Sequence, residues 1–315
     1  MTEISVIILT YNRKHLLPRS IESVLKQSFS NFELLLIDNG SNDGSSEICD
    51  QYAQTDKRVR AVHTGGGNIG YGRNVGLDEA RGNYITFVDD DDYCEHDMLE
   101  FLYNLAVGHQ ADISICGSTY FFETTQTFAP KYIFDKLLLL DKEQGVFELL
   151  ERKRYNNATP TKLFSKKLFD EIRFKVSGKF DDIAMTYKIF EKATKTVAYG
   201  IPKYSFAKHG NNNSGFIQSN QWMNEQLNEY IIAIEERNAY LKQRLPGLEN
   251  YLRYSKWSYY LSMCDKFDAF NMNESRSVYD FMMKELENNL DEFSSYVQYH
   301  TERDMDLLKK LGGKL

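Results

Sequence analysis

The sequence predicts an α/β fold, in which a mostly parallel sheet is flanked by helices and followed by a helix-rich C-terminal region. Three observations lead to this prediction. Apolar, β-branched runs alternate with helix-like segments over the first third of the chain. Polar, turn-forming residues follow these runs. From about Phe216 onward, glycine becomes sparse and aromatic residues recur within segments of helical texture.

The apolar runs have the length and composition of strands buried on both faces. They lie at residues 4–9, 32–37, 59–62, 83–88 and 112–116. Helical spacing marks the segments between them. Its apolar positions are Leu17, Ile21, Val24 and Leu25, then Ile48 and Tyr52, and later Met98, Phe101, Leu102 and Leu105. This βαβαβ order predicts parallel neighbouring strands with helices on both faces of the sheet.

Sheets of this kind bind their ligands at the carboxyl ends of the strands, so the residues that follow each strand are the candidates for function. The sequence offers four such places. They are Thr10-Tyr11-Asn12, Asp38-Asn39-Gly40-Ser41, a glycine-rich loop at residues 65–76 that opens into a helix, and the run Asp89-Asp90-Asp91-Asp92.

Composition excludes several classes of function. A formal net charge of -7 disfavours nucleic acid as a partner, and no lysine-rich or arginine-rich block stands out. The apolar stretch near Met1 is too short for a signal sequence, and no run has the length of a membrane span. The four cysteines are scattered without a CxxC pair. We therefore expect a cytoplasmic protein in a reducing compartment.

The aspartate run at residues 89–92 indicates a divalent metal site. Several carboxylates at the end of one buried strand repel one another unless a cation neutralises them. Mg²⁺ or Mn²⁺ binds one or two protein carboxylates and completes its shell with phosphate oxygens and water, which suits a nucleoside diphosphate substrate. The alternative is a solvated acidic turn, and the position at a strand end favours the metal.

The glycine-rich loop allows a second interpretation. Residues 65–70 fit the pattern GxGxxG, and Asp89 follows about twenty residues later, as in dinucleotide-binding folds. That fingerprint belongs to the first βα turn, however, and the first turn here contains no glycine. A dinucleotide-dependent oxidoreductase is therefore the lesser alternative, and we expect a flexible loop that leads to Arg73 and Asn74 near a phosphate.

Four segments together resemble the successive signatures of glycosyltransferase family 2, in order and in spacing. The resemblance covers roughly the first 215 residues. The segments are Ser5 to Arg13, Ile37 to Ser45, Asn68 to Gly76, and Phe87 to Asp92. The resemblance implies a GT-A fold over residues 1–215 and inverting transfer of a sugar from a nucleoside diphosphate sugar to an acceptor hydroxyl.

The resemblance also assigns roles to residues. Tyr11 would lie against the base and Asp38 at its edge, where Asn39 replaces the usual second acid; an amide can still pair with uracil or thymine. Arg73 would lie near the diphosphate. The implied nucleotide-binding residues are Thr10, Tyr11, Asn12, Asp38, Asn39, Arg73 and Asp90. Asp89 and Asp91 match the metal-binding DxD motif, with Asp91 the more direct ligand.

Two later segments extend the resemblance. Thr161 to Phe174 is similar to the stretch that precedes the family's acidic catalytic motif, and Asp181-Asp182 occupies that motif's place. Asp182 matches the general base, and Asp181 replaces a glutamate. Asp181 could also cap the helix that begins there. The segment from Tyr204 to Ser214 resembles a final motif near the diphosphate, which makes His209 a candidate metal ligand or a structural histidine.

Residues 216–315 form the predicted helical subdomain. Aromatic residues crowd one part of it, at Tyr251, Tyr254, Trp257, Tyr259 and Tyr260. Such rings suit a glycan acceptor or a membrane surface; alternatively, they pack the helices or join two copies in a homodimer. The resemblance implies surface polysaccharide synthesis on a lipid-linked acceptor, peripheral to the inner membrane face. The alternative to an enzyme is a nucleotide- or glycan-binding protein of the same fold that has no transfer activity.

Overall fold

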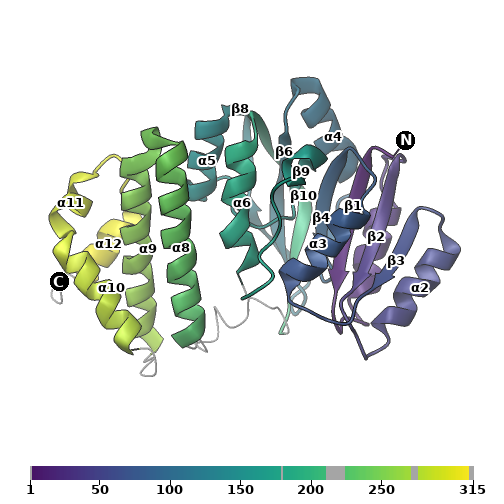
Figure 1. Cartoon of the computed structure of the whole chain (residues 1–315), viewed down its shortest axis with the longest axis horizontal. Helices are drawn as coiled ribbons and strands as arrows, with labels where there is room; N and C mark the ends of the chain where they lie inside the picture. Colours follow the sequence, from purple (N-terminus) through teal and green to yellow (C-terminus); the bar gives the residue numbers. More distant parts are fainter. Residues whose placement is uncertain (1, 179, 211–223, 271–275, 312–315) are drawn as a thin grey trace. The chain divides into compact units, whose positions relative to one another are not determined.

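The computed structural model describes residues 2–178, 180–210, 224–270 and 276–311 (Figure 1). The chain divides into two compact units, Met1–His209 and Gly210–Leu315. The subdomain boundary predicted at residues 215 and 216, like Ser214 and Trp222, lies outside the described residues. Each unit is described by itself.

A single mixed sheet forms the centre of the first unit. In the described residues its main path runs β3-β2-β1-β4-β9-β6-β10-β5, while β7 pairs with β6 and β8 with β10. The strands are β1 (Ile4–Thr10), β2 (Phe32–Asp38), β3 (Val59–His63), β4 (Tyr84–Asp89), β5 (Tyr93–Cys94), β6 (Ile113–Phe122), β7 (Thr127–Tyr132), β8 (Phe134–Asp141), β9 (Lys162–Ser165) and β10 (Lys195–Lys208).

Most of the paired residues belong to parallel strand pairs, which confirms the predicted α/β class with a mostly parallel sheet. β1 lies between β2 and β4, β2 also pairs with β3, and β6 pairs with β10, all in parallel. Strand β9 is antiparallel to both β4 and β6 and joins these two parallel groups. The short β5 is antiparallel to β10, which brings the end of β10 beside the aspartate run.

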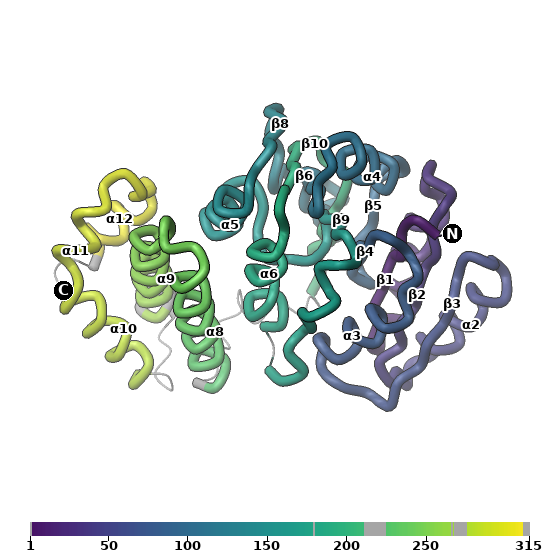
Figure 2. The backbone as a smooth tube through the Cα atoms, turned by 45° about the horizontal axis from the view of Figure 1, so that its top comes forward, coloured from purple at the N-terminus to yellow at the C-terminus, as the bar shows by residue number. Residues whose placement is uncertain are grey.

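Helices cover both faces of this sheet (Figures 1 and 2). They are α1 (Leu17–Leu25), α2 (Ser45–Thr55), α3 (Ile69–Glu79), α4 (Met98–His109), α5 (Lys142–Glu151) and α6 (Asp181–Lys192), with a 3₁₀ turn at Lys166–Phe169. Alternate residues of β1, Ile4, Val6 and Ile8, belong to one buried cluster with apolar residues of α1, α2 and α4. Helix α3 packs on the opposite face, against Ile7 and Leu9.

The glycines of the predicted loop at residues 65–76 divide into two groups: Gly65, Gly66 and Gly67 precede helix α3, and Gly70, Gly72 and Gly76 lie within it. Helix α3 begins at Ile69, and the Asn68 side chain caps it by accepting from the backbone N–H of Tyr71 at 2.9 Å. A Cβ on Gly70 would lie 2.1 Å from the carbonyl oxygen of Lys175, and one on Gly72 would lie 2.2 Å from Leu9. These glycines therefore permit close packing of α3, which is a sufficient reason for them without a phosphate.

The second unit is helical in its described parts. Its elements are α8 (Asn224–Arg244), a 3₁₀ turn at Pro246–Leu248, α9 (Glu249–Phe270), α10 (Arg276–Asn288), α11 (Leu290–Ser295) and α12 (Glu302–Leu311). Helix α9 is the central one and contacts α8, α10, α11 and α12. In the described part of the chain, no helix combines the length and apolar character that crossing a bilayer requires.

Most of the aromatic residues singled out on α9 are core residues of this unit, which favours the alternative that they pack the helices over the one in which they present rings to a glycan or a membrane. Tyr251, Tyr254, Trp257 and Tyr260 are each 5% exposed or less. The Tyr254 ring stacks on Phe293 at a centroid distance of 5.5 Å, and Trp257 stacks on Tyr296 at 6.3 Å. Rings buried in this way hold the helices together and cannot stack on a sugar.

Candidate active site

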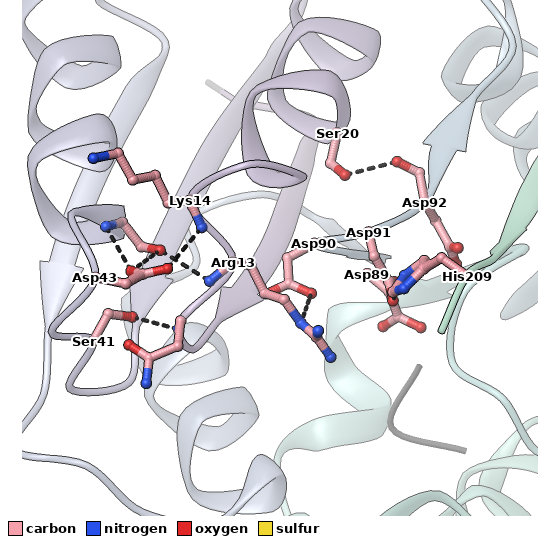
Figure 3. A network of polar contacts seen from close by, with 12 residues as sticks. Arg13, Lys14, Ser20, Ser41, Asp43, Asp89, Asp90, Asp91, Asp92 and His209 are labelled. Atoms are coloured by element: carbon pink, nitrogen blue, oxygen red, sulfur yellow. Dashed lines mark hydrogen bonds and ion pairs between the residues drawn. The ribbon is translucent and has the colours of Figure 1, made fainter. Parts of the chain in front are cut away.

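The ends of β1 and β2 are tied together by backbone and side-chain hydrogen bonds (Figure 3). Asn12 adopts a left-handed conformation with φ 53°. Its backbone N–H donates to Ser41 Oγ at 3.0 Å, and its Oδ1 accepts from the N–H of Asn42 at 2.9 Å. Asn12 thus shapes the turn after β1, while the neighbouring Tyr11 is 57% exposed and presents its ring to solvent.

Asp38, at the end of β2, is buried and held by hydrogen bonds. Ser46 donates to its Oδ2 at 2.6 Å, and the Ser41 N–H donates to its Oδ1 at 3.2 Å. His63 Nδ1 lies 3.2 Å from the same Oδ2. Burial by itself would raise the pKa of Asp38, but these hydrogen bonds hold it below its ordinary value, so the carboxylate is charged at neutral pH.

Asn39 is fully engaged within the fold. Its N–H donates to the carbonyl oxygen of Thr10 at 2.9 Å. Its amide nitrogen donates to the carbonyl oxygen of Gly67 at 2.8 Å, and its amide oxygen accepts from Thr64 at 2.9 Å. The amide therefore fastens the glycine-rich loop to β2, a role that sequence reasoning missed.

The four aspartates after β4 point in different directions (Figure 3). Asp91 meets His209, whose Nε2 lies 3.0 Å from Asp91 Oδ2, and both side chains are largely buried. Asp90 turns toward Arg13, with 3.8 Å between its Oδ1 and the arginine Nε. Burial, reinforced by the charge of Asp91, raises the pKa of Asp90 to about 7.

Asp92 has a structural role that the sequence did not reveal. Its Oδ2 accepts from the Tyr204 hydroxyl at 2.8 Å and its Oδ1 from the N–H of Ala207 at 2.7 Å. Its carbonyl oxygen accepts from Ser20 at 2.7 Å. Asp92 therefore fastens β10 and α1 to the strand end, which brings His209 next to Asp91.

Arg73 joins the aspartate run to the start of α6. Its Nη1 lies 2.6 Å from Asp181 Oδ2 and its Nη2 lies 3.5 Å from Asp89 Oδ1. The guanidinium also lies against Phe174, 5.4 Å from the ring centroid. Three segments that are distant in sequence thus meet at one arginine.

Residues close to this arginine correct two expectations. Phe180 occupies the N-cap position of α6 without a side-chain cap, and Asp181, in the first turn, pairs with Arg73 instead of capping the helix. Asn74 exchanges two hydrogen bonds of 2.9 Å with the backbone of Phe174. Its side chain therefore holds the segment before α6 rather than a phosphate.

Asp182 lies partly buried beside this pair. Its Oδ1 accepts from the N–H of Ile183 at 2.7 Å, and no salt bridge to it occurs within the described residues. Burial raises the pKa of Asp182, and the charge of Asp181 raises it further, while Arg73 opposes both. A carboxyl group with a raised pKa and no tight ion pair is suited to accept a proton.

The chemistry of the strand-end carboxylates suits a divalent metal that a substrate helps to bind. Among the described residues, no group of three or more His, Cys, Asp or Glu side chains is placed to hold a metal ion by itself. Burial raises the pKa of Asp89 to about 6, with Arg73 opposing and nearby carboxylates adding to it. A cation would relieve this crowding, and Mg²⁺ and Mn²⁺ accept few protein ligands when phosphate oxygens supply the rest. The carboxylates of Asp89 and Asp91 are ligands of the kind that such an ion takes, so this strand end suits a metal whose remaining ligands come from a substrate.

Two further residues complete the site, and sequence reasoning overlooked both. Arg13 approaches Asp90, as described above. Arg19, on α1, donates through Nη2 to the carbonyl oxygen of Asp91, and its Nη1 lies 2.8 Å from Glu123. Arg19 lies in the first turn of the helix that follows the first strand, and this position was the only signal in the sequence.

Known proteins resemble this chain in sequence. A family model described as glycosyl transferase family 2 matches residues 5–175. The chain is 34% identical to glycosyltransferase GlyG of Streptococcus pneumoniae, in a match that covers 62% of this chain and 67% of GlyG. It is 26% identical to glycosyltransferase GlyA of the same organism, covering 90% of this chain but only 41% of GlyA.

A solved structure shares the fold. The structure of S. aureus TarS in complex with UDP-GlcNAc superposes with a TM-score of 0.73 and 18% identity, covering 98% of this chain and 85% of that one. At this identity the likeness concerns the fold.

Proposed function

The chain belongs to glycosyl transferase family 2, and from that premise we propose that it transfers a sugar from a nucleoside diphosphate sugar to an acceptor hydroxyl with inversion at the anomeric carbon. One observation carries the proposal: the acidic end of β4, Arg73 and the acidic pair at the start of α6 converge at one place. A uridine diphosphate sugar is the first donor to test, because TarS was solved with UDP-GlcNAc.

The nucleoside would lie at the ends of β1 and β2. The exposed ring of Tyr11 can stack on a base, and the charged carboxylate of Asp38 can accept from an N–H of the base or a ribose hydroxyl. Asn39 would act through its hold on the glycine-rich loop. Thr10, Asn12 and Asp90 would shape the same turn.

Asp91, Asp89 and His209 would hold Mn²⁺ or Mg²⁺ when the donor is bound. The ion would supply positive charge for the leaving diphosphate. Arg73, which pairs with Asp181, lies beside these residues and can give the diphosphate a second positive contact.

Asp182 would act as the general base. The acceptor oxygen forms its bond to the anomeric carbon while the bond between that carbon and the diphosphate oxygen breaks, and the hydroxyl proton passes to the Asp182 carboxylate. Attack opposite the leaving group inverts the configuration. Arg73 counters the rise in the pKa of Asp182, which keeps the carboxylate available as a base.

A screen of nucleoside diphosphate sugars tests the proposal. We expect one class of donor to release its nucleoside diphosphate in the presence of Mn²⁺ or Mg²⁺, and nuclear magnetic resonance to show an inverted anomer in the product. A retained configuration would contradict the roles given to Asp182, and turnover that is unaffected by a chelator would contradict the metal.

We further propose that the helical unit serves the acceptor, a glycan or lipid-linked saccharide in surface polysaccharide synthesis, rather than the nucleotide. All the residues given roles in donor binding precede residue 210. A chain ending at Gln218 should therefore still bind nucleoside diphosphate with Mn²⁺ while transfer falls. Loss of that binding in a truncated chain whose circular dichroism shows it to be folded would refute the division of roles.

A further inference from the structure

A lysine is completely buried between the aspartate run and the helix of the proposed base. Lys162, the first residue of β9, is 0% exposed. It forms no salt bridge in the part of the chain that the structure describes, and its ammonium group donates to the carbonyl oxygen of Ala158 at 2.6 Å. Burial lowers the pKa of Lys162 to about 7. A methionine of similar length would fill the same space without burying a charge, so packing alone does not account for the lysine.

The residues just before Lys162 are also costly to hold in place. Thr161 has a left-handed backbone with φ 73°, a strained conformation for a β-branched residue. The side-chain oxygens of Asn157 and Thr159 are buried and have no hydrogen-bond partner among the described residues. Strained backbone and unsatisfied polar atoms lower stability, and they occur most often at functional sites. The segment 157–162 therefore has features that stability alone does not favour.

A hydrogen bond connects this segment to β4, the strand that ends at the aspartate run. The carbonyl oxygen of Lys162 accepts from the Thr86 hydroxyl at 2.8 Å. Thr86 lies on β4, three residues before Asp89, and is itself completely buried. In the register of these two strands, Thr86 is opposite Leu163. Lys162 is thus fixed to the strand that carries Asp89.

A second hydrogen bond connects the same segment to α6, whose first turn holds Asp182. The Thr186 hydroxyl donates to the carbonyl oxygen of Asn157 at 2.8 Å. The next carbonyl group along the chain is the one that accepts from the Lys162 ammonium group. Thr186 follows Asp182 by four residues, so the two side chains lie on the same side of the helix. Lys162 therefore holds the short piece of backbone to which this side of α6 is bound.

We propose that Lys162 is a positioning residue that fixes the proposed base relative to the aspartate run. Its carbonyl group is bound to β4, and its ammonium group holds the backbone that Thr186 joins to α6. The first turn of α6, with Asp182, is thereby kept in place relative to Asp89. The inference rests on the proposed function, because this placement matters for proton transfer to Asp182.

Fixed placement matters because the attacking hydroxyl, the base and the leaving diphosphate must align. A displacement of about 1 Å in a reacting group costs about a hundredfold in rate. Lys162 is completely buried, so its effect on the reaction passes through Asp182 and not through contact with a substrate.

Kinetics on single and double variants test this role. We expect Lys162→Met to lower kcat for release of uridine diphosphate from UDP-GlcNAc with Mn²⁺ at least about tenfold. The affinity for uridine diphosphate, measured by isothermal titration, should stay unchanged. In an Asp182→Asn chain, Lys162→Met should cause no further loss, because the group that it positions is already gone. An equal loss in both backgrounds would overturn the proposal.

Lys166→Met is the matched control. Its ammonium group also donates to a backbone carbonyl oxygen, that of Ala80 at 2.5 Å, which lies at the end of α3 and not in the segment before β9. The effect of Lys166→Met should therefore be of similar size with Asp and with Asn at position 182. Dependence on Asp182 that is as strong for Lys166 as for Lys162 would contradict a specific role for Lys162.

Hydrogen–deuterium exchange tests the connection itself and does not depend on the donor. Thr186→Val removes the hydroxyl that donates to Asn157, whereas Thr186→Ser keeps it. Exchange in the first turn of α6 should rise in Thr186→Val and in Lys162→Met, and Thr186→Ser should restore most of the protection. Unchanged exchange in the first two variants would overturn the proposal. If the wild type releases no uridine diphosphate, the proposed function fails, and the exchange measurement still decides whether Lys162 fixes α6.

Discussion

The strand-end site and the helical unit both bring together charged and aromatic side chains, but the carboxylates differ: burial raises the pKa values of Asp89 and Asp182 at the strand ends, whereas hydrogen bonds lower that of Asp304 in the helical unit. On α9, Lys256 lies 2.8 Å from Glu235 and 3.2 Å from Glu285, and the Tyr254 hydroxyl donates to Asp304. At the strand ends, the carboxylates of Asp89, Asp181 and Asp182 surround the single guanidinium of Arg73. Carboxylates with lowered pKa values stabilise a fold, whereas crowded carboxylates with raised pKa values cluster at functional sites.

The largest effect is expected from removing a carboxylate at the proposed metal site. Asp91→Asn should lower the rate of transfer at least about a hundredfold, because the leaving diphosphate loses its electrostatic support. The melting temperature should stay close to that of the wild type. Asp135→Asn, which removes one exposed carboxylate on β8, is the control. Normal turnover of the Asp91 variant at limiting Mn²⁺ would show the metal assignment to be wrong.

The second prediction separates the two acids of α6. Asp182→Asn should lower kcat by about a hundredfold or more with little change in nucleotide affinity, because it removes only the proton acceptor. Asp181→Asn should chiefly loosen Arg73 and so weaken nucleotide affinity. Steady-state kinetics and isothermal titration on both variants distinguish these effects. A reversed pattern would make Asp181 the base.

The third prediction concerns Asp92, the aspartate of the run whose role is structural. Asp92→Asn should cost about 1–3 kcal/mol of unfolding free energy, because an amide cannot accept from both Tyr204 and Ala207. The transfer rate should fall only if the loosened end of β10 moves His209 away from Asp91. Urea unfolding gives the free energy. An unchanged midpoint would mean that Asp92 does not fasten β10.

The smallest effect lies in the helical unit. Tyr254→Phe removes one donor to Asp304, which still accepts from Ser258 at 2.6 Å. The variant should lose about 1 kcal/mol of stability and keep full nucleotide affinity. Thermal unfolding and isothermal titration measure the two quantities. Reduced affinity for the nucleotide would show that α9 contributes to donor binding, and the division of roles between the two units would then be wrong.

Much of the first unit could be predicted from the sequence, because its strands are continuous apolar runs and its site residues follow them directly. The pattern brought Asp38, Asp89 and Asp91 to one edge of the sheet, where the structure has them. Strands β5 and β7 to β10 were not predicted. Short or partly exposed strands with polar residues, such as Thr127–Tyr132, carry no clear periodic signal.

The remaining errors came from interactions between distant segments. Nothing local distinguishes Asp91, which faces His209, from Asp92, which fastens Tyr204. The amide of Asn39 bonds to a loop about thirty residues away, and the direction of a side chain at a strand end depends on such partners. In the same way, the sequence could not decide whether the aromatic residues of α9 lie on a binding surface or in the core, because amphipathic rings occur in both places. Most of them lie in the core.

The central claim is that the donor binds through a divalent metal at the strand ends of the first unit. Isothermal titration of uridine diphosphate into the full chain, with Mn²⁺ and then with a chelator, tests it most directly. We expect affinity to fall at least about tenfold, or 1.4 kcal/mol, when the metal is removed, and Asp91→Asn to show the same weak binding under both conditions. Equal affinity of the wild type with and without Mn²⁺ would contradict the account.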